Sequence, residues 1–199
     1  MYYAGVGSRS IPYEVLVQMT KIAERLAGMG YTLRTGQDIN GADRAFRMGI
    51  ENFHIHHPNE MPEKMVLYSS RDATPFAINI AKKYIRDWDN LDDGLKNHYA
   101  KSVMLLLGPD GLVQSKFLIC WTPNGAESQD HVNRRSGNAG LCIQLARDYK
   151  IPVINLKRDN ALDKLEKVLS KVEKAKTNSL RPVKKRYNTV PRSHQARRP

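Results

Sequence analysis

The sequence predicts an α/β fold with a doubly wound, mostly parallel sheet of the Rossmann type. Short apolar runs at residues 2–6, 117–121 and 151–156 are typical of strands buried in such a sheet. Stretches with apolar residues at helical spacing alternate with these runs, at about 13–29, 138–149 and 160–175. A β-α-β-α-β order over the first 56 residues indicates parallel strands, because parallel neighbours need a crossover connection.

The elements follow in order along the chain. A first strand at 2–6 runs into a glycine turn, and Pro12 precedes a helix that Gly28 and Gly30 end. A second strand at 31–35, a helix from Gly41 to Gly49 and a short third strand at 53–56 complete the first half. Residues 60–71 are predicted to be an irregular connector. A helical insertion is expected at about 72–107, beginning at Asp72 and ending before the break at Gly108. In the last strand Pro152 lacks a donor and should stand at the beginning.

The positive charge is concentrated at the carboxyl-terminal end. The chain has 199 residues and a net charge of +12, yet residues 176–199 hold eight Lys or Arg and no Asp or Glu. The other 175 residues carry 24 basic and 20 acidic side chains, a net charge of +4. We therefore expect one domain over 1–175 and a basic tail, disordered in isolation, over 176–199. The tail cations would attract nucleic acid without sequence preference, or serve solubility or a protein partner: Lys184, Lys185, Arg186, Arg197 and Arg198.

Two loops near the start carry the main functional signal. The first strand ends in Gly5-Val6-Gly7-Ser8-Arg9, and the second ends in Thr35-Gly36-Gln37 before a helix that begins near Gly41. Parallel strands place both loops at one edge of the sheet, where backbone N–H groups, the Ser8 hydroxyl and the Arg9 guanidinium would suit a phosphate. Asp43 either stabilises the helix dipole or hydrogen-bonds a ribose or base. Neither a dinucleotide fingerprint nor a Walker A loop is present.

A third loop follows the strand at 117–121. It contains Thr122 and leads to a helix start rich in small residues and cations. In open α/β sheets, ligands bind at this edge. We therefore add Thr122 and the following loop residues to the predicted nucleotide-binding site: Arg135, Ser136, Gly137, Asn138 and Gly140.

These motifs, in this order, resemble the SLOG superfamily of DprA-like and LOG-like Rossmann-type proteins, and most closely the small DprA-like members of bacteriophages and bacteria. The resemblance covers roughly residues 1–157. It rests on the segments 4–9 with Pro12, 33–36, 41–46, 117–125, 137–146 and 151–156. It implies a Rossmann-type domain that binds a nucleotide or single-stranded DNA, as an accessory factor in DNA metabolism without catalysis. It also implies a homo-oligomer, since members of the superfamily commonly pair.

Two departures from the family pattern bear on catalysis. Relatives have a Gly-Gly pair where this chain has Gly36-Gln37, with one extra residue before Gly41. LOG-like hydrolases carry a PGGxGTxxE motif, and its glutamate corresponds here to Gln144, which cannot act as a general acid or base. The enzyme alternative is a nucleotide N-glycoside hydrolase or transferase that uses Asp43 or Glu127 instead. A sensor of a small nucleotide signal is a third alternative.

Metal and membrane functions are not predicted. His54, His56 and His57 lack a carboxylate or cysteine placed to complete a site, so we expect solvent-facing strand histidines, no metal and no cofactor. Cys120 and Cys142 have no metal-ligand spacing and are expected to be buried thiols. The sequence shows neither a membrane-length apolar run nor a secretory signal, which favours the cytoplasm.

Overall fold

The computed structural model describes residues 1–59, 64–133, 136 and 139–179. In this part of the chain a five-stranded, all-parallel sheet has the strand order β3-β2-β1-β4-β5. The predicted α/β class and doubly wound sheet are confirmed. The strands are β1 (Tyr2–Gly7), β2 (Thr32–Gly36), β3 (Met65–Tyr68), β4 (Leu118–Trp121) and β5 (Val153–Asn155).

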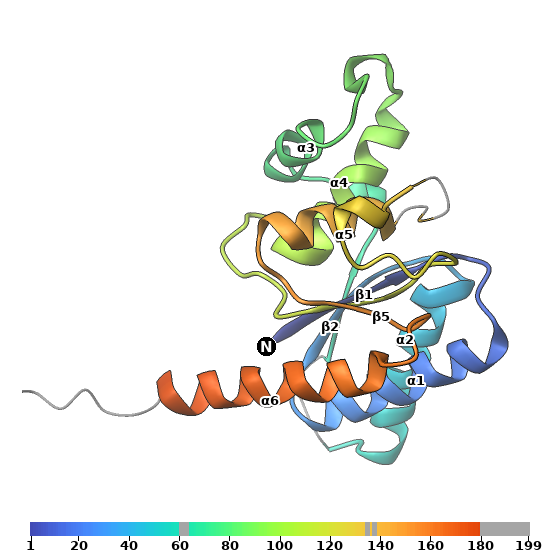
Figure 1. Cartoon of the computed structure of the whole chain (residues 1–199), viewed down its shortest axis with the longest axis vertical. Coiled ribbons are helices and arrows are strands. Elements are labelled where there is room, and N and C mark those ends of the chain that lie inside the picture. Colours follow the sequence, from blue (N-terminus) through green and yellow to red (C-terminus); the bar gives the residue numbers. More distant parts are fainter. Residues whose placement is uncertain (60–63, 134–135, 137–138, 180–199) are drawn as a thin grey trace, which may run out of the picture.

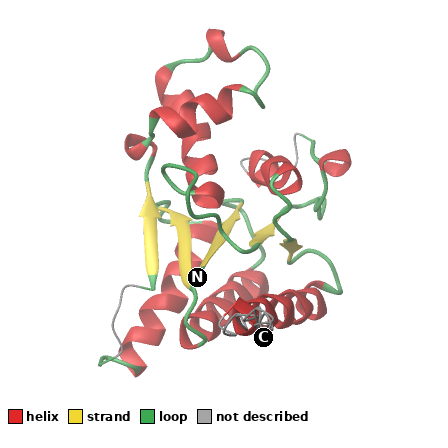
Figure 2. Ribbon diagram, turned by 90° about the vertical axis from the view of Figure 1, so that its left-hand side faces the viewer, coloured by secondary structure: helices red, strands yellow, loops and turns green. Residues whose placement is uncertain are grey.

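Helices cover both faces of the sheet. Figure 1 shows α1 (Tyr13–Gly28), α2 (Gly41–His56) and α6 (Ala161–Ser179) on one face, with α3 (Pro75–Lys82), α4 (Asp93–Leu107) and α5 (Ala139–Asp148) on the other. Figure 2 shows the same layers turned by 90°. Successive strand residues point to opposite layers, so Tyr3 packs with α1, α2 and α6, whereas Ala4 packs with α4 and α5.

The direction of winding reverses between β1 and β4. From β1 the chain moves through α1 and α2 to β2 and β3, and it then crosses by way of α3 and α4 to β4 on the other side of β1. The register pairs Gly7 at the end of β1 with Trp121 at the end of β4. This reversal is the position at which open α/β sheets bind ligands.

The predicted third strand at 53–56 is wrong. These residues form the last turn of α2, because Phe53 continues the helical spacing of the buried residues Phe46, Gly49 and Ile50. His54 and His56 therefore lie on a helix, and the ring of His57 stacks on Phe53 at 4.7 Å between centroids. The third strand is β3, within the stretch predicted to be irregular. It is a four-residue edge strand whose first three residues are only half-buried, which gives a short signal.

The helical region at 72–107 contains two different parts. Helix α4 is the crossover helix of the domain, and Ser102 to Leu107 in its last two turns are all buried. Helix α3 packs on α4 and lies farther from the sheet (Figure 1). At the far end of the sheet Pro152 precedes β5 as predicted, and its carbonyl accepts a hydrogen bond from Leu118 N at 2.9 Å. Among the described residues, no helix is long and apolar enough to cross a membrane.

Candidate functional site

The first two predicted loops lie in direct contact. Gly41, at the start of α2, has a φ of +69°, and a Cβ there would lie 2.4 Å from the carbonyl oxygen of Ser8. The backbone N–H of Ala42 donates to that same oxygen at 3.3 Å. Gly7 is equally confined, since its Cβ would lie 2.9 Å from the Cβ of Ala42. Glycine is therefore required where the two loops meet.

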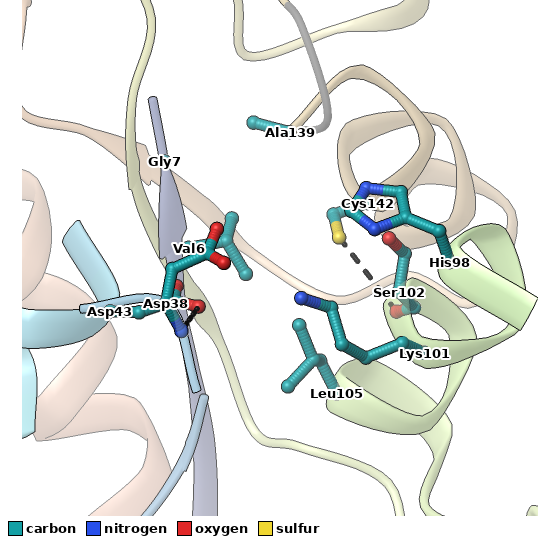
Figure 3. A pocket seen from close by; sticks show the side chains of 10 residues that line it. All are labelled: Val6, Gly7, Asp38, Asp43, His98, Lys101, Ser102, Leu105, Ala139 and Cys142. Atoms are coloured by element: carbon teal, nitrogen blue, oxygen red, sulfur yellow. Dashed lines mark hydrogen bonds between the residues drawn. The ribbon is translucent and has the colours of Figure 1, made fainter. Parts of the chain in front are cut away.

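A small pocket opens beside these loops at the carboxyl end of β1 (Figure 3). It encloses about 30 Å³, which is room for one water molecule or one small polar group of a ligand. Four elements contribute its walls: β1, the β2–α2 connection with the start of α2, α4 and α5. The lining residues are Val6, Gly7, Asp38, Asp43, His98, Lys101, Ser102, Leu105, Ala139 and Cys142.

Asp43 is the central acidic group of the pocket. Its Oδ2 accepts a hydrogen bond from Asp38 N at 3.3 Å, and its Oδ1 lies 3.4 Å from the Thr35 hydroxyl, which donates to Gly5 O at 2.8 Å. Burial raises the pKa of Asp43 above its ordinary value, although Lys101 and the Asp38 N–H oppose the shift. Burial thus outweighs these favourable contacts, and carboxyls with perturbed pKa values concentrate at functional sites.

Lys101 brings the opposing charge from α4. Figure 3 shows its amino group pointing across the pocket toward the two aspartates. Both this amino group and the Asp43 carboxylate occupy the space that a side chain at Gly36 would fill, since a Cβ there would lie 2.1 Å from Asp43 Oδ2 and 2.9 Å from Lys101 Nζ. The pocket thus places a hydrogen-bond acceptor, Asp43, and a cationic donor, Lys101, next to Gly36.

The other residues predicted in the first two loops lie at the rim or in the strands. The Arg9 side chain is 74% exposed, and its Nε lies 3.4 Å from Asp38 Oδ2. Ser8 Oγ accepts a hydrogen bond from Ser10 N, and Gln37 is exposed. Gly5 serves packing, because a Cβ there would lie 2.7 Å from the Phe46 ring. With Ala42 N bound to Ser8 O and two aspartates nearby, the start of α2 suits a hydroxyl better than a phosphate.

The described part of the third predicted loop is held by hydrogen bonds within the loop and to Asn155 of β5. Buried Thr122 Oγ1 accepts from Asn155 Nδ2 at 2.7 Å and from Ala126 N at 3.0 Å. Ser136 Oγ accepts from Asn133 N at 3.1 Å, and a Cβ at Gly140 would lie 3.1 Å from Val132. Arg135, Gly137 and Asn138 lie outside the described residues, as do the tail residues Lys184, Lys185, Arg186, Arg197 and Arg198.

Glu127, the second catalytic candidate from the sequence, does not line the pocket. One of its carboxylate oxygens accepts from Asn155 N at 2.9 Å and the other from Lys164 Nζ at 2.6 Å. Both oxygens therefore hold the loop after β4 against β5 and α6. Of the two candidates, Asp43 alone faces the pocket.

Sequence reasoning missed the contribution of α4. His98, Lys101 and Ser102 line the pocket, yet they stand within a stretch whose apolar residues indicated only a packed helix. The signal available was a polar Lys-Ser pair inside the run from Ala100 to Leu107. A charged residue within a buried helical stripe has to reach a polar space.

Replacing Gly36 by alanine should impair the pocket more than the fold. The new methyl group would displace the ends of two flexible side chains, Asp43 and Lys101, rather than backbone. We expect the affinity for a ligand bound in this pocket to fall by about tenfold or more. The free energy of unfolding should change by no more than about 1 kcal/mol. Calorimetric titration and urea unfolding of the same preparation would measure both. A large loss of stability with intact binding would contradict this assignment.

The chain was compared with protein-family models, with curated proteins and with solved structures. No protein-family model, no curated protein and no solved structure matches this chain.

Proposed function

We propose that this chain binds a nucleotide at the pocket between β1, α2, α4 and α5, as a DprA-like accessory factor in DNA metabolism. The supporting observation is Asp43, a partly buried carboxyl with a raised pKa that shares the pocket with Lys101 at the reversal point of the sheet. The resemblance of the glycine loops to SLOG proteins points in the same direction.

The size and charge of the pocket favour a sugar over a base or a phosphate in its deepest part. A space of about 30 Å³ accommodates a hydroxyl group. A carboxylate accepts hydrogen bonds from the two hydroxyls of a ribose, and a lysine donates to their oxygens. Helix α5 begins at Ala139 on the same wall, where the start of a helix favours the phosphate of the same ligand. The base would then lie outside the mouth.

A titration of the full chain with 5′-AMP tests the proposal, with 2′,3′-dideoxy-AMP as the matched ligand. We expect 5′-AMP to bind about tenfold or more tightly, because the lost hydrogen bonds involve charged groups. Lys101→Met should weaken binding of 5′-AMP, whereas Lys96→Met on the same helix should not. Equal affinity for the two ligands would overturn sugar recognition. Binding of a dT oligomer alone, with no response to Lys101→Met, would place nucleic acid elsewhere on the protein.

A second candidate function rests on the same carboxyl. A raised pKa suits a general acid or base at neutral pH, so Asp43 could assist cleavage of the N-glycosidic bond by water. The sequence position of the usual hydrolytic glutamate holds Gln144, which is why binding without catalysis is preferred. Chromatography for free base after incubation with nucleoside monophosphates separates the two functions. Base release that Asp43→Asn abolishes would establish the enzyme.

A further inference from the structure

A groove lies between α1 and α2, on their solvent-exposed side. It holds about 490 Å³, and its large apolar residues are Tyr13, Leu16 and Val17 of α1, Met48 of α2 and Ile39 of the β2–α2 loop. Tyr13 and Ile39 are 78% and 79% exposed, and Met48 is 41% exposed. Large apolar side chains gathered in one hollow mark a binding surface, whereas scattered ones need no explanation.

The groove is a fixed feature of this helix pair. Small residues of α2, Gly41 and Ala45, line it and leave the hollow open. The Thr20 hydroxyl of α1 donates to Ala45 O at 3.0 Å, and the backbone of α1 also touches Gly49, where a Cβ would lie 2.2 Å from Thr20 O. Because the two helices are in such close contact, the groove is already formed without a ligand. Its volume lies within the range of roughly 300–1,000 Å³ that is usual for small-molecule sites.

Two cations line the groove at one level. Lys21 follows Thr20 on α1 and Arg44 precedes Ala45 on α2, so the contact between Thr20 and Ala45 places both cations at the same height. Arg44 donates from Nη1 to both carboxylate oxygens of Glu51 at 2.9 Å, and within the described part of the chain its Nε and Nη2 donate to no acceptor. Lys21 forms no ion pair with a described residue. Both cations therefore have donors left for an anion.

The order of groups along α1 sets the direction of a ligand in the groove. Tyr13, Leu16 and Val17 come first, Lys21 follows, and the acid Glu24 lies about one turn beyond Lys21. A ligand whose chain covers the apolar residues therefore brings its polar end to the two cations. A positively charged end would have to pass these cations to reach Glu24. The groove thus fits an apolar chain with an anionic end.

We propose that this groove binds an amphiphilic carboxylate, with its apolar chain against Val17 and Ile39 and its carboxylate between Lys21 and Arg44. A guanidinium suits this anion, because its planar fork donates two parallel hydrogen bonds to a carboxylate. A carboxylate with a ten-carbon chain has about a dozen non-hydrogen atoms, and at roughly 30 Å³ each they fill most of the groove. The groove shares no lining residue with the nucleotide pocket, so the two proposals stand or fall separately.

Calorimetric titration of the full chain with decanoate, below the concentration at which decanoate forms micelles, tests the ligand class. We expect saturable binding of one decanoate per chain, at least about tenfold tighter than that of hexanoate, because each buried methylene adds up to about fourfold in affinity. Decyltrimethylammonium has the same chain with a positive end and should bind more weakly. An affinity independent of chain length, or binding of the cation as tight as that of decanoate, would overturn the proposal.

Two pairs of variants test the position of the ligand. Ile39→Glu should lower the affinity for decanoate at least about tenfold, because it places a carboxylate against the apolar chain. Its matched control is Leu112→Glu, since Leu112 is 82% exposed and lies outside the groove. Arg44→Gln should lower the affinity about threefold or more, whereas Lys171→Gln, at an exposed position of α6 outside the groove, should leave it unchanged. Equal effects within either pair would overturn this placement.

Sedimentation velocity separates a small ligand from a second copy of the chain as the occupant of the groove. We expect Ile39→Glu to leave the sedimentation coefficient of the full chain unchanged at every concentration. Self-association that Ile39→Glu abolishes, without saturable binding of decanoate, would assign the groove to a second copy and overturn the proposal.

Discussion

Replacing Asp43 by asparagine is expected to abolish most nucleotide binding and yet to leave the protein as stable as the native chain, or more so. The asparagine fits the hydrogen bonds already present: its oxygen can accept from Asp38 N, and its amide can donate to the Thr35 hydroxyl, which itself donates to Gly5 O. What disappears is the buried negative charge. Loss of hydrogen bonds between a charged acceptor and ligand hydroxyls predicts affinity at least about tenfold lower.

The pH dependence of stability follows from the direction of the Asp43 pKa shift. Burial raises the pKa of this carboxyl in the folded chain, so the native state keeps the proton to higher pH than the unfolded state does. The free energy of unfolding therefore falls as the pH rises from the unfolded pKa, about 3.9, through the folded pKa, and this cost persists at neutral pH. The asparagine variant should lack the decrease, and its advantage in stability should be largest above the folded pKa of Asp43.

Two measurements decide the Asp43 prediction. Titration with 5′-AMP gives the affinity, and urea unfolding between pH 4 and pH 7 gives the stability of both chains. Asp89→Asn is the control for removal of a carboxylate, because Asp89 is exposed and its carboxylate forms a surface ion pair with Lys82 at 2.8 Å. Native-like affinity in the Asp43 variant would remove the supporting observation for the proposed function.

The sheet could be predicted from the sequence because β1, β4 and β5 carry continuous apolar runs. Residues 117–121 and 151–156 lie on either side of the predicted third loop, and they became β4 and β5. The edge strand β3 could not be recognised, because three of its four residues are half-buried. Phe53 misled the strand prediction, since a short stretch around an aromatic residue reads the same in a strand and in the last turn of a buried helix.

Only the part of the candidate site formed by the two glycine loops could be predicted from the sequence. Parallel strands predicted that the first two loops lie at one edge of the sheet, and the close approach of Gly41 to the Ser8 carbonyl shows them in contact. The roles of Lys101 and His98 depend on where the crossover helix α4 passes the end of β1, and that is a tertiary property. The hydrogen bonds that Glu127 accepts from Asn155 and Lys164 join residues far apart in the sequence, so no local pattern could predict them.

The α1–α2 pair that supports the site also makes the sharpest prediction of stability. Gly49 lies where α2 touches α1 backbone to backbone: a Cβ there would lie 2.2 Å from Thr20 O, 2.7 Å from Ala23 Cβ and 2.9 Å from Glu24 N. Helix propensity alone would make Gly49→Ala favourable by about 1 kcal/mol. Because these atoms cannot rotate away, overpacking should prevail, and we expect a net loss of about 3 kcal/mol.

Gly28→Ala is the matched control for Gly49→Ala, because it adds the same methyl group to the same helix pair. Its Cβ would lie 3.5 Å from the Phe53 ring, an ordinary contact, so we expect no loss and a gain of up to about 1 kcal/mol. Urea unfolding of both variants measures the contrast, and equal stabilities would show that α1 and α2 separate easily. If the two helices cannot separate, their spacing also fixes the position of the start of α2, which carries Asp43 at the pocket.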